Sequence, residues 1–122
     1  MLAGHIELIL LITGLATAGV LVVFLAPAPV MKLLFGQAPS DTLSLFIARH
    51  WGLLVGLVGV LLVYAAYDAK VRVPTLIVAS AEKAALVVGL LISPFRQRPT
   101  VLAMALADAG MAAVYVMYLT GL

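Results

Sequence analysis

Six prolines divide this chain of 122 residues into four long apolar runs, and none lies in the interior of a run. An interior proline removes a helix hydrogen bond and clashes with the preceding turn, so this spacing is typical of helices. The runs cover residues 6–26, 43–67, 74–93 and 100–120. At about 1.5 Å per residue, each can cross the roughly 30 Å hydrocarbon core of a bilayer. The sequence therefore predicts four transmembrane helices.

The composition supports a membrane location, because only 10% of the residues are charged and 66% are hydrophobic. A soluble domain carries about a quarter charged residues. Short connections make neighbouring helices antiparallel. We therefore expect an all-α protein, an integral membrane up-down four-helix bundle with both termini on the same side. Residues 1–122 then form a single transmembrane domain.

Several classes of function lack their residues in this sequence. There is no cysteine for a disulfide or a thiolate, and no run of Lys and Arg that could follow a nucleic-acid backbone. No nucleotide-binding, metalloprotease or serine-hydrolase motif is present. His5 and His50 are far apart, and cations compete for the carboxylates, so no metal site is expected. No cofactor is predicted, although a quinone or a lipid stays open as a ligand.

The longest connection, residues 27–42, contains the apolar stretch Val30–Phe35 with one cation, Lys32. This stretch is either a short amphipathic turn at the membrane interface or an irregular hydrophobic loop. Ser40 or Asp41 can cap the second helix.

Four charged residues fall inside the predicted spans, namely Arg49, Glu82, Lys83 and Asp108. Each costs about 2.5–3.5 kcal/mol near the centre of a membrane helix. Helical rise places Arg49, Glu82 and Asp108 in the central part of the membrane. A guanidinium can bridge two carboxylates. We therefore expect these three side chains to form one polar core, which either fixes the helix register or serves function.

Helical periodicity assigns faces to the other candidates. At about 100° per residue, Gly52, Gly56 and Gly59 share the Arg49 face of the second helix, and Gly89 shares the Glu82 face of the third. Small residues permit close helix packing. Thr13 and Thr17 form the most polar stripe of the first helix.

Lys83 and His50 are further candidates for this polar core or for a ligand or ion pathway through it. Lys83 lies about 100° from Glu82, so its alternative is contact with a second subunit or a lipid phosphate, and Trp51 is expected to contact a lipid or a second subunit. His50 is a helix-interface residue or part of a proton relay, because its ordinary pKa is near neutrality.

A proline-marked loop after the first helix, Arg49-x-x-Gly52 opening the second, and the acidic Glu82 in the third form a recognisable layout. This layout resembles the DoxX-like group of small four-helix bacterial membrane proteins. The resemblance implies a location in the bacterial inner membrane. Some members of the group are implicated in quinone-linked sulfur oxidation or redox stress. This chain departs from the group in having no cysteine and in placing Lys83 beside Glu82.

Three functions follow as hypotheses. The first is a non-enzymatic subunit that forms a homo-oligomer or joins a partner membrane protein, because small-residue stripes favour helix association. The second is a carrier or channel for a proton, an anion or a small amphiphile through the polar core. The third is a quinone-linked or lipid-linked membrane enzyme that uses Glu82 or Asp108.

Overall fold

The computed structural model describes residues 2–121, and every regular element in that range is a helix. The short 3-10 helices are η1 (Leu2–His5) and η2 (Ala69–Val71). The α-helices are α1 (Ile6–Ala18), α2 (Leu21–Leu25), α3 (Pro27–Phe35), α4 (Thr42–Tyr67), α5 (Arg72–Leu91) and α6 (Pro99–Leu119).

Four helical stretches are long and apolar enough to cross a membrane. They are Ile6–Leu25, Thr42–Tyr67, Ala69–Leu91 and Pro99–Leu119. Their ends agree with the predicted spans to within two residues, except that the third stretch begins at Ala69 rather than at residue 74. Pro74 lies in the first turn of α5, where a backbone N–H has no helical partner, so the proline does not delay the helix.

The connection after the first span contains a regular helix, whereas the sequence predicted a short amphipathic turn or an irregular hydrophobic loop. Residues 27–35 form α3, with Pro27 in its first turn. The helix ends at Gly36, whose φ of 79° is left-handed and favours glycine. At the start of α4, Asp41 is the capping residue, since its carboxylate accepts a hydrogen bond of 2.9 Å from the backbone N–H of Ser44.

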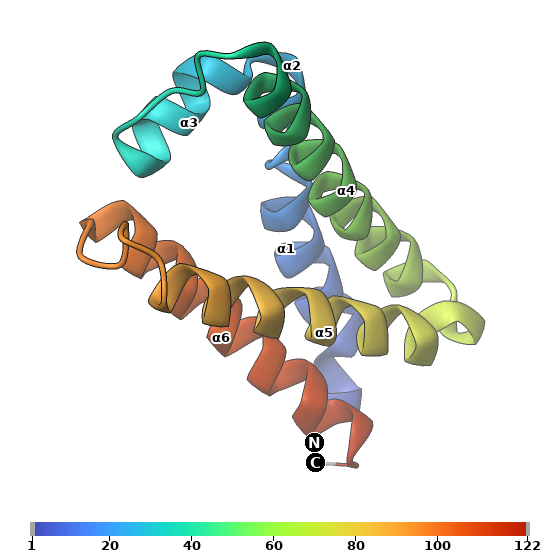
Figure 1. The fold of residues 1–122 in the computed structure, drawn as a ribbon. Coiled ribbons are helices and arrows are strands. Elements are labelled where there is room, and N and C mark those ends of the chain that lie inside the picture. The colour runs from blue at the N-terminus through green and yellow to red at the C-terminus, as the bar shows by residue number, and fades with distance from the viewer. Residues whose placement is uncertain (1, 122) are drawn as a thin grey trace.

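The helices pack as two groups rather than side by side along their full length. Helices α1 and α2 pack along α4, and α5 packs along α6, while α4 and α5 join the two groups. In Figure 1, α4 and α5 diverge from the η2 turn like the arms of a V, and α1 crosses behind them. Helix α3 and the α5–α6 turn lie toward the open end of the V.

Close backbone approach holds the α1–α2 segment against α4. A Cβ atom added at Gly59 would lie 2.1 Å from the backbone nitrogen of Ala18, and one added at Gly14 would lie 2.9 Å from that of Val63. At Gly52 an added Cβ would lie 2.9 Å from the backbone nitrogen of Phe24. These positions admit no side chain, so glycine sets the distance between the two segments.

Two apolar clusters hold the helices together. The larger, where α1, α4, α5 and α6 meet, contains Ile6, Leu10, Leu62, Ala65, Ala66, Leu76, Ala79 and Tyr115. The smaller contains Leu90, Val101 and Ala105, with Phe35, Leu86, Phe95 and Met104 packed against it. The site described next lies between these two clusters.

The turn from α4 to α5 is fixed by Arg72. Its Nε donates to the carbonyl oxygen of Ala65 at 2.9 Å, and its Nη2 donates to that of Ala66 at 3.1 Å. These carbonyls belong to the last turn of α4, where helical partners are missing and a cation is favourable. Arg72 therefore fixes the vertex of the V.

Candidate functional site

The charge buried most deeply in the protein is Lys83, in the middle of α5. Its side chain is 2% exposed, and its Nζ lies 3.2 Å from Oδ1 of Asp108 on α6, whose side chain is 13% exposed. The same Nζ donates a hydrogen bond of 2.9 Å to Oγ1 of Thr17 on α1. Thr17, Lys83 and Asp108, here called the Lys83 cluster, thus connect three helices through one ammonium group.

The hydrogen bonds continue along α1. Thr17 donates its hydroxyl proton to the carbonyl oxygen of Thr13 at 2.8 Å, which leaves its Oγ1 lone pairs for Lys83. The hydroxyl group of Tyr115, a fully buried residue of α6, donates to Oγ1 of Thr13 at 2.6 Å. A buried polar group costs free energy unless it is hydrogen-bonded, and these residues satisfy one another. The polar stripe on α1 is therefore the surface that receives Lys83 and Tyr115.

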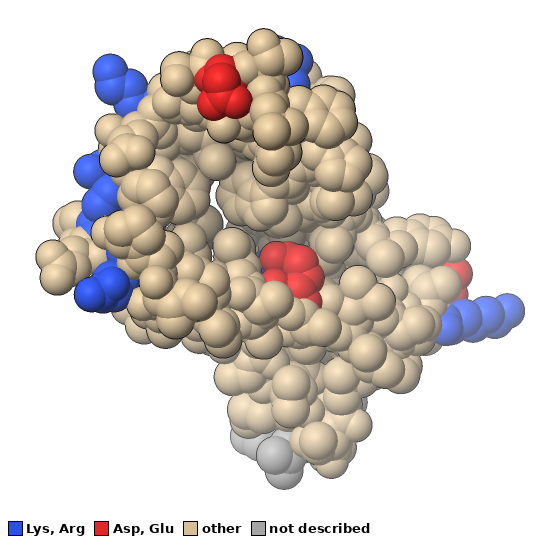
Figure 2. Space-filling model, viewed as in Figure 1, with Lys and Arg blue, Asp and Glu red and all other residues tan. Residues whose placement is uncertain are grey.

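Glu82 lies beside the Lys83 cluster but does not complete it. Its Oε1 is buried and has no hydrogen-bond partner within residues 2–121. Figure 2 shows acidic surface in the hollow between the α4 and α5 arms, surrounded by uncharged side chains. The centre of the protein therefore contains two carboxylates and one ammonium group.

A cavity of about 180 Å³ borders the Lys83 cluster. All three members of the cluster line it, and the other walls are apolar side chains from α1, α4, α5 and α6. An ammonium group has three N–H donors, and Lys83 uses two of them. The cavity therefore has an apolar interior and one wall that can donate and accept hydrogen bonds.

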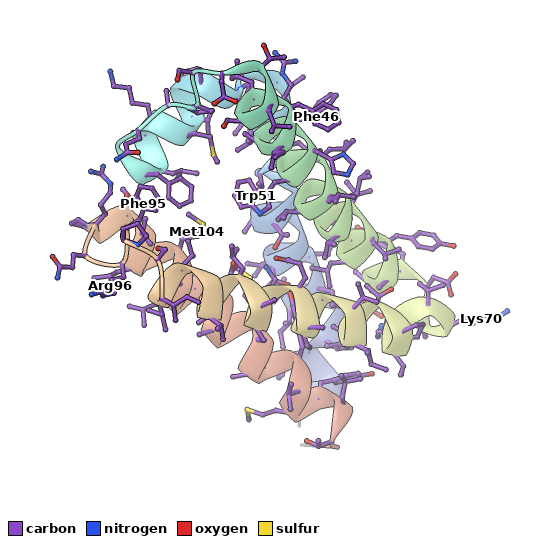
Figure 3. All side chains as sticks on the ribbon, viewed as in Figure 1. Phe46, Trp51, Lys70, Phe95, Arg96 and Met104 are labelled. Atoms are coloured by element: carbon purple, nitrogen blue, oxygen red, sulfur yellow. The ribbon has the colours of Figure 1, made fainter. Side chains whose placement is uncertain are left out.

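Trp51 of α4 lines this cavity and also a second pocket of about 480 Å³ nearer to α3. In Figure 3, Trp51 and Met104 point into the space between the arms, and Phe46 points away from it. The second pocket is lined by Met31, Phe35, Gln37, Ala38, Pro39, Ser44, Ile47, Ala48, Trp51 and Phe95. Trp51, expected to contact lipid or another subunit, is half-buried and lines both spaces.

The structure corrects the expected place of Arg49. Arg49 is exposed on α4 and forms no ion pair, and the only salt bridge in residues 2–121 joins Lys83 to Asp108. Arg49 lies at the edge of the α4 contact face, which begins instead with Ala48. Near the end of a span, its long side chain can reach the interface. Lys83, one of the candidates for the polar core, takes the place expected for Arg49 and is not turned toward a second subunit or a lipid phosphate.

His50 and Gly89 also lie outside the core. His50 is exposed, and its ring stacks on that of Phe46 with 6.2 Å between the ring centroids. A Cβ atom added at Gly89 would meet nothing within 4 Å, so this glycine has no packing role in the chain. The expectation for Gly89 is corrected because α5 turns its Lys83 face inward, not its Glu82–Gly89 face.

The sequence also contains a signal that Lys83, rather than Glu82, points to the centre of the fold. The buried residues of α5 include Leu76, Ala79, Lys83 and Leu90, which follow a seven-residue repeat. This repeat is typical of a helix face that packs against other helices. Reading α5 from its aliphatic residues, rather than from Glu82, would have placed Lys83 inside the protein.

The fold and the site define an all-helical protein with four helices apolar enough to cross a membrane and an ion pair buried in the middle of them. No protein-family model, curated protein or solved structure matches the chain. Within residues 2–121, no three His, Cys, Asp or Glu side chains lie close enough together to hold a metal ion. The functional argument therefore rests on the Lys83 cluster and its cavity.

Proposed function

We propose that this protein is a carrier of the bacterial inner membrane that binds a small, uncharged amphiphile at the Lys83 cluster. In this proposal all four helical stretches cross the membrane as an up-down bundle, with both termini on one side. The observation that carries the proposal is the cavity, because it joins apolar walls to a buried lysine with an unused N–H. A hydroxyl or carbonyl headgroup fits this combination of groups.

The charge at the site selects among possible ligands. Lys83 is already paired with Asp108, so the site has no spare positive charge to bind an anion. A neutral headgroup needs no such charge, and it can accept a hydrogen bond from Lys83 or donate one to Asp108. The volume of about 180 Å³ is smaller than a typical pocket for a drug-sized ligand, so it suits a headgroup with the first part of a chain.

The position of the cavity favours a carrier over an open channel. Leu86 and Met104 border the cavity and pack against the smaller apolar cluster, and Met111 borders it and packs against the larger one. Apolar side chains therefore lie at both ends of the cavity along the helices. A ligand would bind there out of contact with water.

Trp51 provides the test, because it is the only tryptophan in the sequence and lines the cavity. In phosphatidylcholine nanodiscs, 2-bromododecan-1-ol should quench its fluorescence with a saturable component. The matched probe 2-bromododecane, which lacks the hydroxyl group, should quench only in proportion to its concentration. A hydrogen bond to a charged group contributes about 1.5–3 kcal/mol, so the double variant Lys83→Met/Asp108→Leu should weaken the saturable component at least about tenfold.

Arg49→Gln is the control variant, since Arg49 is exposed and away from the cavity. It should bind the bromoalkanol like the unaltered protein. Identical, unsaturable quenching by the two probes would show that the cavity does not select a polar headgroup, and the proposal would then fail.

A second candidate is an oligomeric or accessory membrane subunit, favoured by a groove on the outer surface. The groove has a volume of about 470 Å³, lies between α1 and α6 and is almost entirely apolar. Its base includes Gly110, at which an added Cβ would meet nothing within 4 Å. A helix of a second subunit could therefore approach here.

For this candidate, native mass spectrometry from nanodiscs should detect a dimer or a complex with a partner subunit. Gly110→Leu should shift the distribution toward the monomer, whereas Gly89→Leu, on another helix, should leave it unchanged. A purely monomeric protein without a partner would exclude this candidate and leave the carrier proposal intact.

A further inference from the structure

Three cations gather at the open end of the V. Lys32 belongs to α3, and Arg96 and Arg98 belong to the α5–α6 turn. Figure 2 shows basic side chains along this edge of the molecule, and Figure 3 shows Arg96 and Lys70 at opposite ends. We call Lys32, Arg96 and Arg98 the basic edge.

The opposite end differs because its charges are balanced or already bound. Glu7 and Asp68 lie there with Lys70 and Arg72, and the guanidinium of Arg72 is bound to the carbonyl groups of α4. At the basic edge the nearby carboxylate is Asp41. The Ser44 side chain and the Ser44 backbone N–H both hydrogen-bond to Asp41 and hold its pKa below the ordinary value. Asp41 therefore stays ionised, and this end of the protein has three positive charges near one negative charge.

The cations of the basic edge do not line the apolar pocket of about 480 Å³, but each lies next to its lining residues. Lys32 follows Met31, and Arg96 follows Phe95, and both of these neighbours line the pocket. Arg98 lies against Gly36, which stands between the pocket residues Phe35 and Gln37. Its guanidinium packs against Gly36, where an added Cβ would lie 2.7 Å from Cζ of Arg98.

The rim is held in place by direct contacts between α3 and the α5–α6 region. The rings of Phe35 and Phe95 meet edge to face with 5.3 Å between their centroids. The Thr100 hydroxyl donates to the carbonyl oxygen of Leu34. Nε of Arg98 is buried and has no hydrogen-bond partner in the part of the chain that the structure describes. The guanidinium beside the pocket therefore has an unsatisfied donor.

We propose that the basic edge and this pocket form a binding site for an anionic phospholipid. The phosphate group would lie against Arg98, Arg96 and Lys32, and the first part of an acyl chain would enter the pocket along Ile47 and Trp51. Arginine binds phosphate through paired N–H donors, and basic pockets between membrane helices bind anionic headgroups. The pocket requires an apolar chain and the rim requires a negative charge, and an anionic phospholipid supplies both.

The same charges orient the chain in the membrane. Connections rich in Lys and Arg stay on the cytoplasmic side, where anionic lipids also give the membrane surface a negative potential. The basic edge then faces the cytoplasmic leaflet, and both chain termini face the other side. This site is separate from the Lys83 cluster, and the inference does not depend on the carrier proposal.

Trp51 also serves as the reporter for this site, because it lines the pocket. Nanodiscs of unlabelled phosphatidylcholine would receive increasing fractions of phosphatidylglycerol with a brominated acyl chain, or of phosphatidylcholine with the same chain. Each cation near a membrane surface contributes a factor of about five in affinity. Half-maximal quenching should therefore need at least about fivefold less of the brominated phosphatidylglycerol.

The variants identify the residues responsible. Lys32→Gln/Arg96→Gln removes two exposed cations of the basic edge without touching the Arg98–Gly36 contact, and it should weaken the preference for phosphatidylglycerol at least about fivefold. Lys70→Gln, which removes an exposed cation at the opposite end, should keep the full preference. Lys83→Met/Asp108→Leu should also keep it, which separates this site from the carrier site.

Three results would overturn the inference. They are equal quenching by the two lipids, an unchanged preference in Lys32→Gln/Arg96→Gln, and a preference that is abolished by millimolar inorganic phosphate at constant ionic strength. The last result would assign the site to free phosphate rather than to a lipid headgroup.

Discussion

Lys83→Met is expected to destabilise the protein by about 3–5 kcal/mol, because it leaves the carboxylate of Asp108 without its partner inside the membrane. The double variant Lys83→Met/Asp108→Leu should recover most of this loss, since it removes both charges and fills their place with apolar atoms. Replacing a whole buried ion pair by apolar side chains is often neutral or stabilising. The double variant should therefore be more stable than Lys83→Met, although it carries one more substitution.

The free energy of unfolding in mixed detergent micelles would measure this difference, with Lys70→Met as the exposed control. The cycle also needs Asp108→Leu alone, which leaves Lys83 unpaired and should again cost several kcal/mol. If the double variant lost as much stability as the two single variants together, the ion pair would not be the reason for their cost.

Gly59→Ala is expected to destabilise the protein by about 1–3 kcal/mol or more, because the new methyl group would overlap the backbone of Ala18. The obstacle is main chain, which cannot rotate away as a side chain can. Helix α4 must therefore move away from the α1–α2 segment. The contacts of Gly14 with Val63 on the same interface would be weakened as well.

Gly89→Ala is the matched control and should act in the opposite direction. An added Cβ at Gly89 meets nothing within 4 Å, so only the better helix propensity of alanine remains, about 1 kcal/mol. Thermal unfolding of both variants in one detergent would compare them directly. Equal destabilisation by the two substitutions would show that close approach at Gly59 is not what alanine disrupts.

The membrane-length helices could be predicted because prolines and apolar length act locally. A helix needs about 20 apolar residues to cross a bilayer, and the sequence displays four such runs. The helix α3 could not be separated from a loop, because nine residues with two prolines give a weak pattern. The divergence of α4 and α5 depends on packing between distant segments, which the pattern of one helix does not encode.

The polar residues of the site were recognised as a group, but their pairing was not. The cost of a charge in lipid identified Lys83, Glu82 and Asp108 without any structure. Lys83 and Glu82 are adjacent on α5, so the rotation of this helix about its axis decides which of them faces Asp108. The sequence pattern did not determine that rotation. Arg49 satisfied the same depth criterion, yet its flexible side chain allows it to lie at the edge of the fold.

The three members of the Lys83 cluster are translated at different times, because they lie far apart in the sequence. Thr17 precedes Lys83 by 66 residues, and Asp108 follows Lys83 by 25. At about 5–20 residues per second, the ribosome makes Asp108 roughly 1–5 s after Lys83. During that interval Thr17 on the first helix is the only other member of the cluster that has been made. Thr17 is thus the earliest partner for the lysine, and the carboxylate that neutralises it arrives with the last helix.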